Sequence, residues 1–193
     1  MKPDRRHIQI SFNSPVILLF TVISFLVLVL DRITGSGTTY LFFSVYRSSL
    51  ANPLTYLRLF GHVLGHAGWE HYIGNFTLIL VVGPLLEEKY GSKNMLIVIL
   101  STAFVTGLVH VLLFPQSLLL GASGVVFAFI LLASITSVEN GKIPATFLLV
   151  AVIYIGGQIY EGIFVADNVS NLTHILGGAV GSGIGFALNK KRA

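Results

Sequence analysis

The stretch THILGGAVGSGIG, residues 173–185, carries the clearest packing signal in the chain. Gly177, Gly181 and Gly185 recur every fourth residue, which places them on one stripe of a helix. In an apolar segment, such a stripe of small residues lets a second helix approach closely. His174 lies about one turn before Gly177 on nearly the same face. The pattern predicts a closely packed membrane helix with an ionisable group near one end.

The composition around this stretch excludes an ordinary soluble domain. Of 193 residues, 54% are hydrophobic and only 10% are charged, and the apolar residues form long blocks. The chain has no cysteine, which excludes disulfides, thiolate catalysis and cysteine metal sites. A net charge of +4 could indicate nucleic acid, but Lys and Arg stand at the ends of the apolar blocks and not in one patch. We therefore expect a multi-pass membrane protein that binds lipid and no nucleic acid.

The apolar blocks predict an all-α membrane protein with one domain over residues 1–193. Backbone polar groups in lipid must be satisfied internally, and no alternating pattern indicates a barrel. Residues 1–13 are expected to be a cytoplasmic segment, and no small-residue cleavage site follows the first apolar block. The six expected spans are at about 15–30, 74–86, 94–114, 123–138, 143–157 and 172–188.

The Lys and Arg residues predict the orientation of these spans. With both termini in the cytoplasm, the cytoplasmic segments hold nine of them and the outer side holds three, Arg32, Arg47 and Arg58. The outer segment 31–69 is too apolar for a solvated tail, so we expect it to lie in the membrane interface. There Arg58 would be satisfied by backbone carbonyls or by lipid phosphate.

A possible nucleophile stands where an outer loop meets the fourth span, in Gly121-Ala122-Ser123-Gly124. Free backbone N–H groups at a helix N-terminus can stabilise an oxyanion, and flanking glycines let a substrate backbone approach. The expected fourth helix is roughly 24 Å long against a hydrocarbon core of about 30 Å, so Ser123 would lie below the outer surface. The alternative interpretation is an ordinary helix cap with a flexible start.

The fourth span also carries a small-residue stripe, Gly124 and Ala128, that matches the glycines of the sixth span. Packing of the two stripes would set His174 beside Ser123, within reach for proton transfer. The alternative is a glycine-rich seam with an incidental histidine. Because ionisable residues inside membranes are rare and usually functional, we favour the catalytic interpretation.

His71 and Asn75 are four residues apart at the head of the second span and share one helical face. Both can donate hydrogen bonds, so they could complement the N–H of Ser123 in an oxyanion site. The alternative is a hydrogen-bonded pair between helices without catalysis.

A metal site is also conceivable, because His62, His66 and His71 follow one another at spacings of four and five residues. No acidic residue stands in the helical His-Glu-x-x-His order, however. We therefore expect no metal and no cofactor. His62 and His66 are expected to be hydrogen-bonding struts of the outer loop, and His110 a packed histidine.

Together these residues resemble the rhomboid family of intramembrane serine proteases. The resemblance follows the chain in order: Leu57-Arg58; His62 and His66; His71 with Asn75; Glu87 with Gly91-Ser92; Gly121 to Gly124; and His174 with Gly177 and Gly181. It implies a bacterial-type six-helix bundle in the plasma membrane, a Ser123–His174 dyad open to the outer side, and cleavage of single-span membrane proteins near the lipid boundary. It also implies a side gate for substrate at about 153–167.

The chain departs from the family pattern at Phe127, where many members carry tyrosine. Phenylalanine can stack against the His174 ring but cannot hydrogen-bond to it. The competing class is a catalytically inactive relative that binds membrane clients, although such relatives lose the serine or the histidine. A transporter would need polar residues along a continuous path, whereas the polar groups here gather at one end. The sequence indicates neither a particular substrate nor an oligomeric state.

Overall fold

The computed structural model describes residues 12–35, 37–135, 145–164 and 168–190. Within these ranges the fold is all-helical, as the sequence predicts, and the only ladder pairing is an isolated antiparallel bridge between Val45 and Leu119. The elements are α1 (Pro15–Ile33), α2 (Gly37–Phe42), α3 (Pro53–Gly61), the 3₁₀ turn η1 (His62–Leu64), α4 (Trp69–Tyr90), α5 (Ser92–Leu113), α6 (Ser123–Ser134), α7 (Ala145–Phe164) and α8 (Asn168–Lys190).

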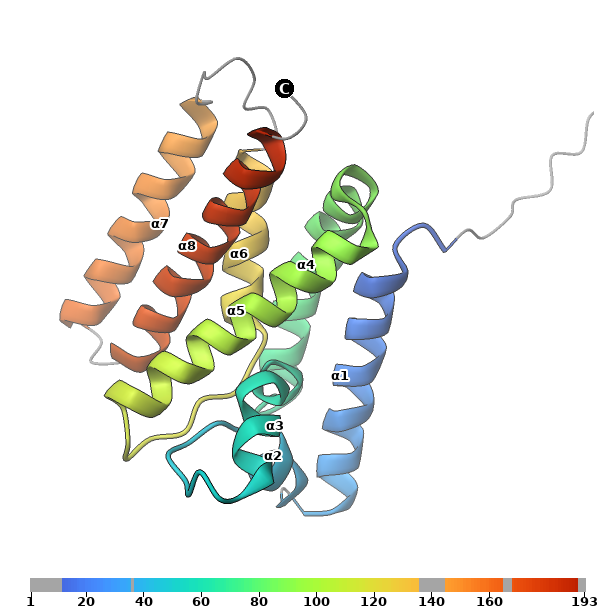
Figure 1. Ribbon diagram of the computed structural model, residues 1–193, viewed down its shortest axis with the longest axis vertical. Coiled ribbons are helices and arrows are strands. Elements are labelled where there is room, and N and C mark those ends of the chain that lie inside the picture. The colour runs from blue at the N-terminus through green and yellow to red at the C-terminus, as the bar shows by residue number, and fades with distance from the viewer. Residues whose placement is uncertain (1–11, 36, 136–144, 165–167, 191–193) are drawn as a thin grey trace, which may run out of the picture.

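The long helices form a bundle with α6 inside it. Figure 1 shows α1 at one edge, α7 at the other and α6 behind α8. The short helix α6 packs against α4, α5, α7 and α8, and its residues Val125, Ala128, Phe129 and Leu132 are buried. A helix that is apolar all round is expected in such a central position.

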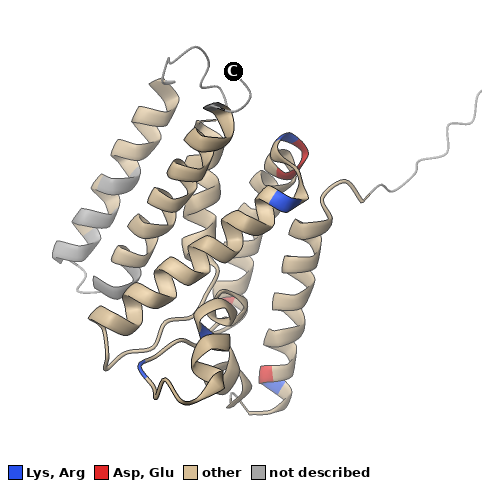
Figure 2. Cartoon of the chain, in the orientation of Figure 1, with Lys and Arg blue, Asp and Glu red and all other residues tan. Residues whose placement is uncertain are grey.

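Two described helices, α1 and α5, are long and apolar enough to cross a membrane, while α6 is apolar but only 12 residues long. Many large apolar side chains remain exposed along α1, α4 and α5. Figure 2 shows that the described Lys, Arg, Asp and Glu residues lie near helix ends and in the connecting segments, leaving the middle of the bundle without charge. Charges near the bilayer centre are costly, and this distribution avoids them.

Several helix bounds differ from the expected spans. Helix α4 begins at Trp69 and not near residue 74, because its first turn is polar and hydropathy alone does not detect it. The outer segment 31–69 contains α2, α3 and η1. The expected span 123–138 corresponds to α6, which ends at Ser134, and residues 136–138 lie outside the described part. Residues 1–11 of the expected cytoplasmic segment and 165–167 of the expected gate lie outside it as well.

Helices α6 and α8 are in backbone contact along their small-residue stripes. A Cβ atom built at Gly177 would overlap the carbonyl oxygen of Gly124, and one built at Gly181 would overlap that of Ala128. A Cβ at Gly185 would overlap the side chain of Ile135. Glycine is therefore sterically required at positions 177 and 181, where the neighbour is backbone, whereas at position 185 the neighbouring side chains can shift. The closeness of the two helices depends on the first two glycines.

Buried polar side chains stabilise the end of the bundle where α1 begins and α6 ends. The Glu87 carboxylate accepts hydrogen bonds from the backbone N–H groups of Val16 and Ile17, both at 3.0 Å, and from the Ser92 hydroxyl at 2.6 Å. Glu87 thus satisfies N–H groups at the start of α1 that have no partner within that helix.

The early C-terminus of α6 is satisfied by a second polar side chain at this end. Asn189 Nδ2 donates to the Ile135 carbonyl at 2.7 Å, and the Tyr90 hydroxyl donates to Asn189 Oδ1 at 3.1 Å. A helix that stops inside a membrane bundle exposes unpaired carbonyls, so this contact compensates for the shortness of α6.

At the end of the bundle where α6 begins, the segment before α4 supports the loop that leads into α6. Gly121 N donates to the His62 carbonyl at 2.9 Å, and Ala122 N donates to His66 Nε2 at 3.4 Å. Two bonds of 2.9 Å between Val45 and Leu119 continue the pairing. The loop 114–122 therefore has backbone partners far away in sequence.

Buried contacts also hold the histidines and the arginine of this segment. His62 contacts the Arg58 carbonyl at 3.2 Å and the Thr106 hydroxyl at 3.3 Å. Arg58 Nε donates to the Leu41 carbonyl at 2.7 Å, and its guanidinium lies 4.4 Å from the centre of the Tyr46 ring. Of the two partners expected for Arg58, the structure shows a backbone carbonyl.

His66 acts here as a neutral imidazole. Its Nε2 accepts from Ala122 N, so the ring proton lies on Nδ1 and donates to the Leu64 carbonyl at 3.2 Å. Burial lowers the pKa of His66, and likewise that of His62, from 6.5 to about 4. A proton on Nε2 would remove the acceptor that Ala122 N uses.

The α6–α8 contact predicts unequal effects for two glycines of the same helix. Gly181→Ala should destabilise the protein by about 1–3 kcal/mol, because the new methyl group meets the backbone of α6. Gly183→Ala is the matched control, since nothing lies within 4 Å of its Cβ position, and it should leave the melting temperature unchanged or slightly raised. Thermal unfolding in detergent measures both, and equal melting temperatures for the two variants would contradict the contact.

The buried histidines predict that acid destabilises the fold. The unfolded chain takes up protons near pH 6.5, whereas folded His62 and His66 resist protonation until about pH 4. Stability is therefore full above pH 6.5 and falls as the pH drops toward 4, by roughly 2 kcal/mol for each histidine at pH 5. Thermal unfolding at pH 7.5 and pH 5 tests this. His66→Gln, which keeps an acceptor for Ala122 N, should show a shallower pH dependence, and a slope equal to that of the natural chain would refute it.

Candidate active site

Ser123 is the first residue of α6 and is half-buried. N–H groups in the first turn of a helix have no partner within the helix, and they point outward from its end. Ala122 at the N-cap provides no side-chain hydrogen bond to them. The site therefore combines a hydroxyl with backbone donors and the positive end of a helix dipole.

The loop before Ser123 requires glycine at position 121. Gly121 has φ +116°, a conformation that residues with a side chain rarely adopt. A Cβ atom there would lie 2.6 Å from Cε1 and from Nε2 of His71. The backbone before Ser123 therefore passes directly against the His71 imidazole, which brings together two residues from separate elements.

His174 lies on α8 against the first turns of α6. Its ring centre is 4.4 Å from that of Phe127, with a tilt of 44°. Phe127 is one turn after Ser123, and the backbone contact of Gly177 with Gly124 lies one turn after His174 on α8. These contacts on either side hold His174 at the end of α6 that carries Ser123. The ring of Phe127 packs against the imidazole and limits its rotation.

Asn75 provides an unused hydrogen-bond donor in the same place. It is buried on α4, one turn after His71, and its Nδ2 lies 3.8 Å from the Cβ position of Gly121. This Nδ2 has no hydrogen-bond partner among the described residues. A buried donor without a partner is costly, and native structures usually have a reason for it. An acceptor oxygen placed beside Gly121 would supply the missing partner.

Several expected site residues lie outside this constellation. His62 and His66 contact the loop backbone from the segment before α4, although the His66 ring also lies 5.0 Å from the His71 ring. Arg58 and Glu87 anchor other segments. Among the described residues, no three of His, Cys, Asp and Glu are placed to hold a metal ion.

Some supporting residues were not predicted from the sequence. Thr106 contacts His62, and Asn189 contacts the end of α6, both across large sequence separations. His110, expected only to pack, places its Nε2 3.1 Å from the Ser117 carbonyl in the loop before α6. No spacing pattern signals these partners. The one available signal was chemical: a polar residue inside an apolar helix needs a partner.

Comparison with known proteins matches the Rhomboid domain to residues 53–191. The chain is 30% identical over 159 residues to Rhomboid-related protein 2 of Mus musculus, covering 72% of this chain and 53% of the relative. It is 28% identical over 171 residues to Rhomboid protease GluP of Bacillus subtilis, covering 84% of this chain and 32% of the relative. It thus spans about half of the mouse relative and about a third of the bacterial one.

The domain match includes the segment that holds the α6 loop, the loop itself and the α6–α8 contact. The resemblance drawn from the sequence is thereby confirmed at the level of the family. The chain belongs to the rhomboid family and is an integral membrane protein.

Proposed function

We propose that this protein is an intramembrane serine endopeptidase that cleaves single-span membrane proteins near the outer membrane boundary with a Ser123–His174 dyad. The observation that carries the proposal is the backbone contact of Gly177 with Gly124, which holds His174 against the first turns of α6. The bacterial relative named a rhomboid protease supports the reaction class. The proposal includes six spans, with both termini in the cytoplasm and the site on the outer side.

In the proposed reaction, His174 takes the proton of the Ser123 hydroxyl while the oxygen attacks a peptide carbonyl carbon. The carbonyl π bond breaks and leaves an oxyanion. His174 then gives its proton to the leaving amine as the C–N bond breaks, forming an acyl-enzyme. His174 then deprotonates a water molecule, which attacks the ester carbonyl carbon. The bond between this carbon and Ser123 Oγ breaks, His174 returns the proton to Oγ, and the carboxylic acid product leaves.

The oxyanion would be held by three donors: the backbone N–H of Ser123, the His71 ring and the Asn75 amide. The close contact of His71 with Gly121 and the unpartnered Nδ2 of Asn75 support this assignment. Donors that are fixed before the reaction need no reorganisation when charge develops.

The chain provides no carboxylate in the motif around His174, so the proposed machinery is a dyad. In a triad, a buried aspartate holds the imidazole in its tautomer and orientation. Here the Phe127 ring and the tight α6–α8 contact would orient the His174 imidazole instead. Phenylalanine in place of tyrosine provides packing without a hydrogen bond.

The substrates of such a site would be transmembrane helices that unwind near their outer end. A hydrogen-bonded helix hides its carbonyls from a nucleophile, so local unwinding must precede attack. The backbone beside Ser123 is flanked by Gly121 and the buried Ala122, which favours small substrate side chains at the cleaved bond. Neither residue offers a charged contact.

The dyad predicts loss of cleavage in two single variants. Ser123→Ala and His174→Ala should each lower the cleavage of a single-span substrate by about 10⁴-fold or more. Ser134→Ala is the matched control on α6, because its hydroxyl donates to the Ile130 carbonyl within the same helix. Cleavage by the purified chain in detergent measures all three. Retained cleavage in Ser123→Ala would refute the assignment, and an inactive natural chain would favour client binding without proteolysis.

The oxyanion assignment predicts a selective effect on turnover. Asn75→Ala should reduce kcat by about 10²–10³-fold with little change in KM, because the lost donor acts on the transition state. Thr77→Ala is the control, since Thr77 is exposed on the same helix. Steady-state kinetics with a fluorogenic transmembrane substrate separates the two parameters. An unchanged kcat in Asn75→Ala would assign this amide a purely structural role.

A further inference from the structure

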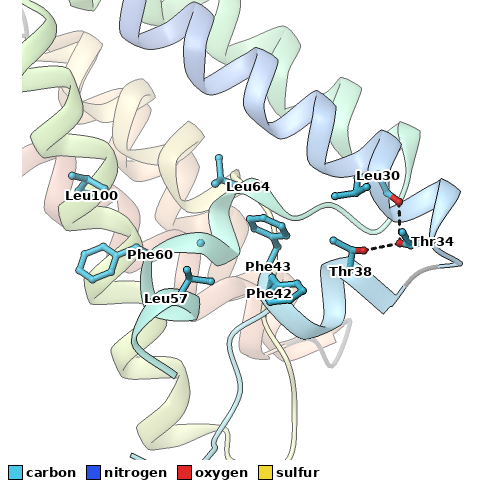
Figure 3. A pocket seen from close by; sticks show the side chains of 10 residues that line it. Leu30, Thr34, Thr38, Phe42, Phe43, Leu57, Phe60, Leu64 and Leu100 are labelled. Carbon is cyan, nitrogen blue, oxygen red and sulfur yellow. Dashed lines mark hydrogen bonds between the residues drawn. The ribbon is translucent and has the colours of Figure 1, made fainter. Parts of the chain in front are cut away.

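An apolar groove lies on the face formed by α1 and α5, and Ser123 is not among its lining residues. Two adjoining cavities, of about 700 Å³ and about 300 Å³, share the side chains of Phe60, Leu64 and Leu100 as lining. We call their union the α1–α5 groove. Figure 3 shows side chains from α1, α2, α3, η1 and α5 around the larger cavity. Cavities of this size are typical of small-molecule sites.

The groove offers no charge and no free polar group to an occupant. No residue that lines the two cavities is charged. The two polar side chains, Thr34 and Thr38, satisfy each other: their hydroxyl oxygens are 2.6 Å apart, and Thr34 Oγ1 also lies 2.9 Å from the Leu30 carbonyl (Figure 3). The occupant must therefore be apolar over its whole buried length.

The position of the groove identifies the source of that occupant. Both cavities have walls from α1 and α5, the two described helices that are long and apolar enough to cross a membrane. Leu19, Leu30 and Leu100 line the groove and are exposed on the outer surface of these helices. The groove is thus continuous with the surface that an integral membrane protein presents to lipid, and acyl chains are present at it in excess.

Other occupants fit this chemistry less well. Water would find no polar partner among the satisfied threonines. An extended peptide would bring backbone N–H and C=O groups that nothing in the groove can satisfy, at a cost of several kcal/mol for each group in hydrocarbon. A flexible hydrocarbon chain has no polar group to satisfy and can adapt its shape to both cavities.

We propose that the α1–α5 groove is a binding site for one acyl chain of a bilayer phospholipid. Transfer from lipid to the groove gains no hydrophobic free energy, because both surroundings are apolar, so shape and dispersion contacts select the chain. The groove lining includes Gly61 and Val63, the two neighbours of His62, whose carbonyl accepts from Gly121 N. A bound chain would therefore support the segment that tethers the loop before Ser123. The binding itself does not depend on the proposed protease activity.

Acyl-chain photocrosslinking tests this proposal. The full chain is reconstituted in vesicles of phosphatidylethanolamine and phosphatidylglycerol that contain a trace of phosphatidylcholine with a diazirine on one acyl chain. After illumination, mass spectrometry should find adducts concentrated at Phe60, Leu64 and Leu100. Leu112, which lies on α5 outside the groove and is more exposed than Leu100, should carry about tenfold fewer, the equivalent of about 1.4 kcal/mol in binding free energy.

Two variants make the test decisive. Leu100→Trp places an indole ring at a residue that lines both cavities and should abolish the excess of adducts at Phe60 and Leu64. Leu112→Trp adds the same ring at an exposed position outside the groove and should leave the excess of adducts at Phe60 and Leu64 unchanged. Leu57→Trp, at the rim, serves as a second filling variant if Leu100→Trp lowers the melting temperature. Even labelling of all lipid-facing residues, or unchanged adducts in both filling variants, would overturn the proposal. So would preferential crosslinking of the groove to a photoreactive substrate helix.

Discussion

The structure depends on the distance between α6 and α8. At Gly124 and Ala128 the backbone of α6 touches the backbone of α8, and only glycine at positions 177 and 181 permits that contact. No hydrophobic force drives helices together in lipid, so close van der Waals packing of small residues has to do so. The same contact sets how far His174 stands from the end of α6. The stability of the fold and the proposed chemistry thus both depend on the α6–α8 contact.

The second constraint is the absence of water around irregular backbone. The loop 114–122 carries N–H and C=O groups into the bundle, and the structure pairs them with Val45, His62 and His66. At the opposite end Asn189 satisfies the last turn of α6. These contacts allow a helix that is roughly 18 Å long, at about 1.5 Å per residue, to sit inside a membrane bundle. The shortness of α6 supports the proposal that Ser123 lies below the outer membrane surface.

Much of this arrangement could be predicted from the sequence because the signals are local. The all-helical fold follows from apolar blocks, and the family follows from weak motifs in the correct order; both are confirmed. Helical periodicity places Gly177 with Gly181, and His71 with Asn75, on common faces. The roles proposed for Ser123 and His174 remain predictions, because neither the fold nor the family match tests them.

The remainder depends on contacts between distant segments, which leave no spacing pattern. His66 meets Ala122 and Asn189 meets Ile135 across more than fifty residues of sequence. Hydropathy did not predict the start of α4 at Trp69, because the first turn of this helix is polar. The α1–α5 groove arises from the way α2, α3 and η1 fold between two helices, and this connection could not be read from composition.

The most direct test of the account is the labelling of the natural chain by a fluorophosphonate, which reacts with serines activated by a neighbouring base. Mass spectrometry would locate the adduct, and Gly177→Ala would be compared with Gly183→Ala, whose Cβ meets open space. The account predicts an adduct on Ser123 in the natural chain and in Gly183→Ala. It predicts strongly reduced labelling in folded Gly177→Ala, because the added methyl group pushes α8 and His174 away from α6. An unlabelled Ser123 in the natural chain, or equal labelling of Ser123 in all three proteins, would contradict it.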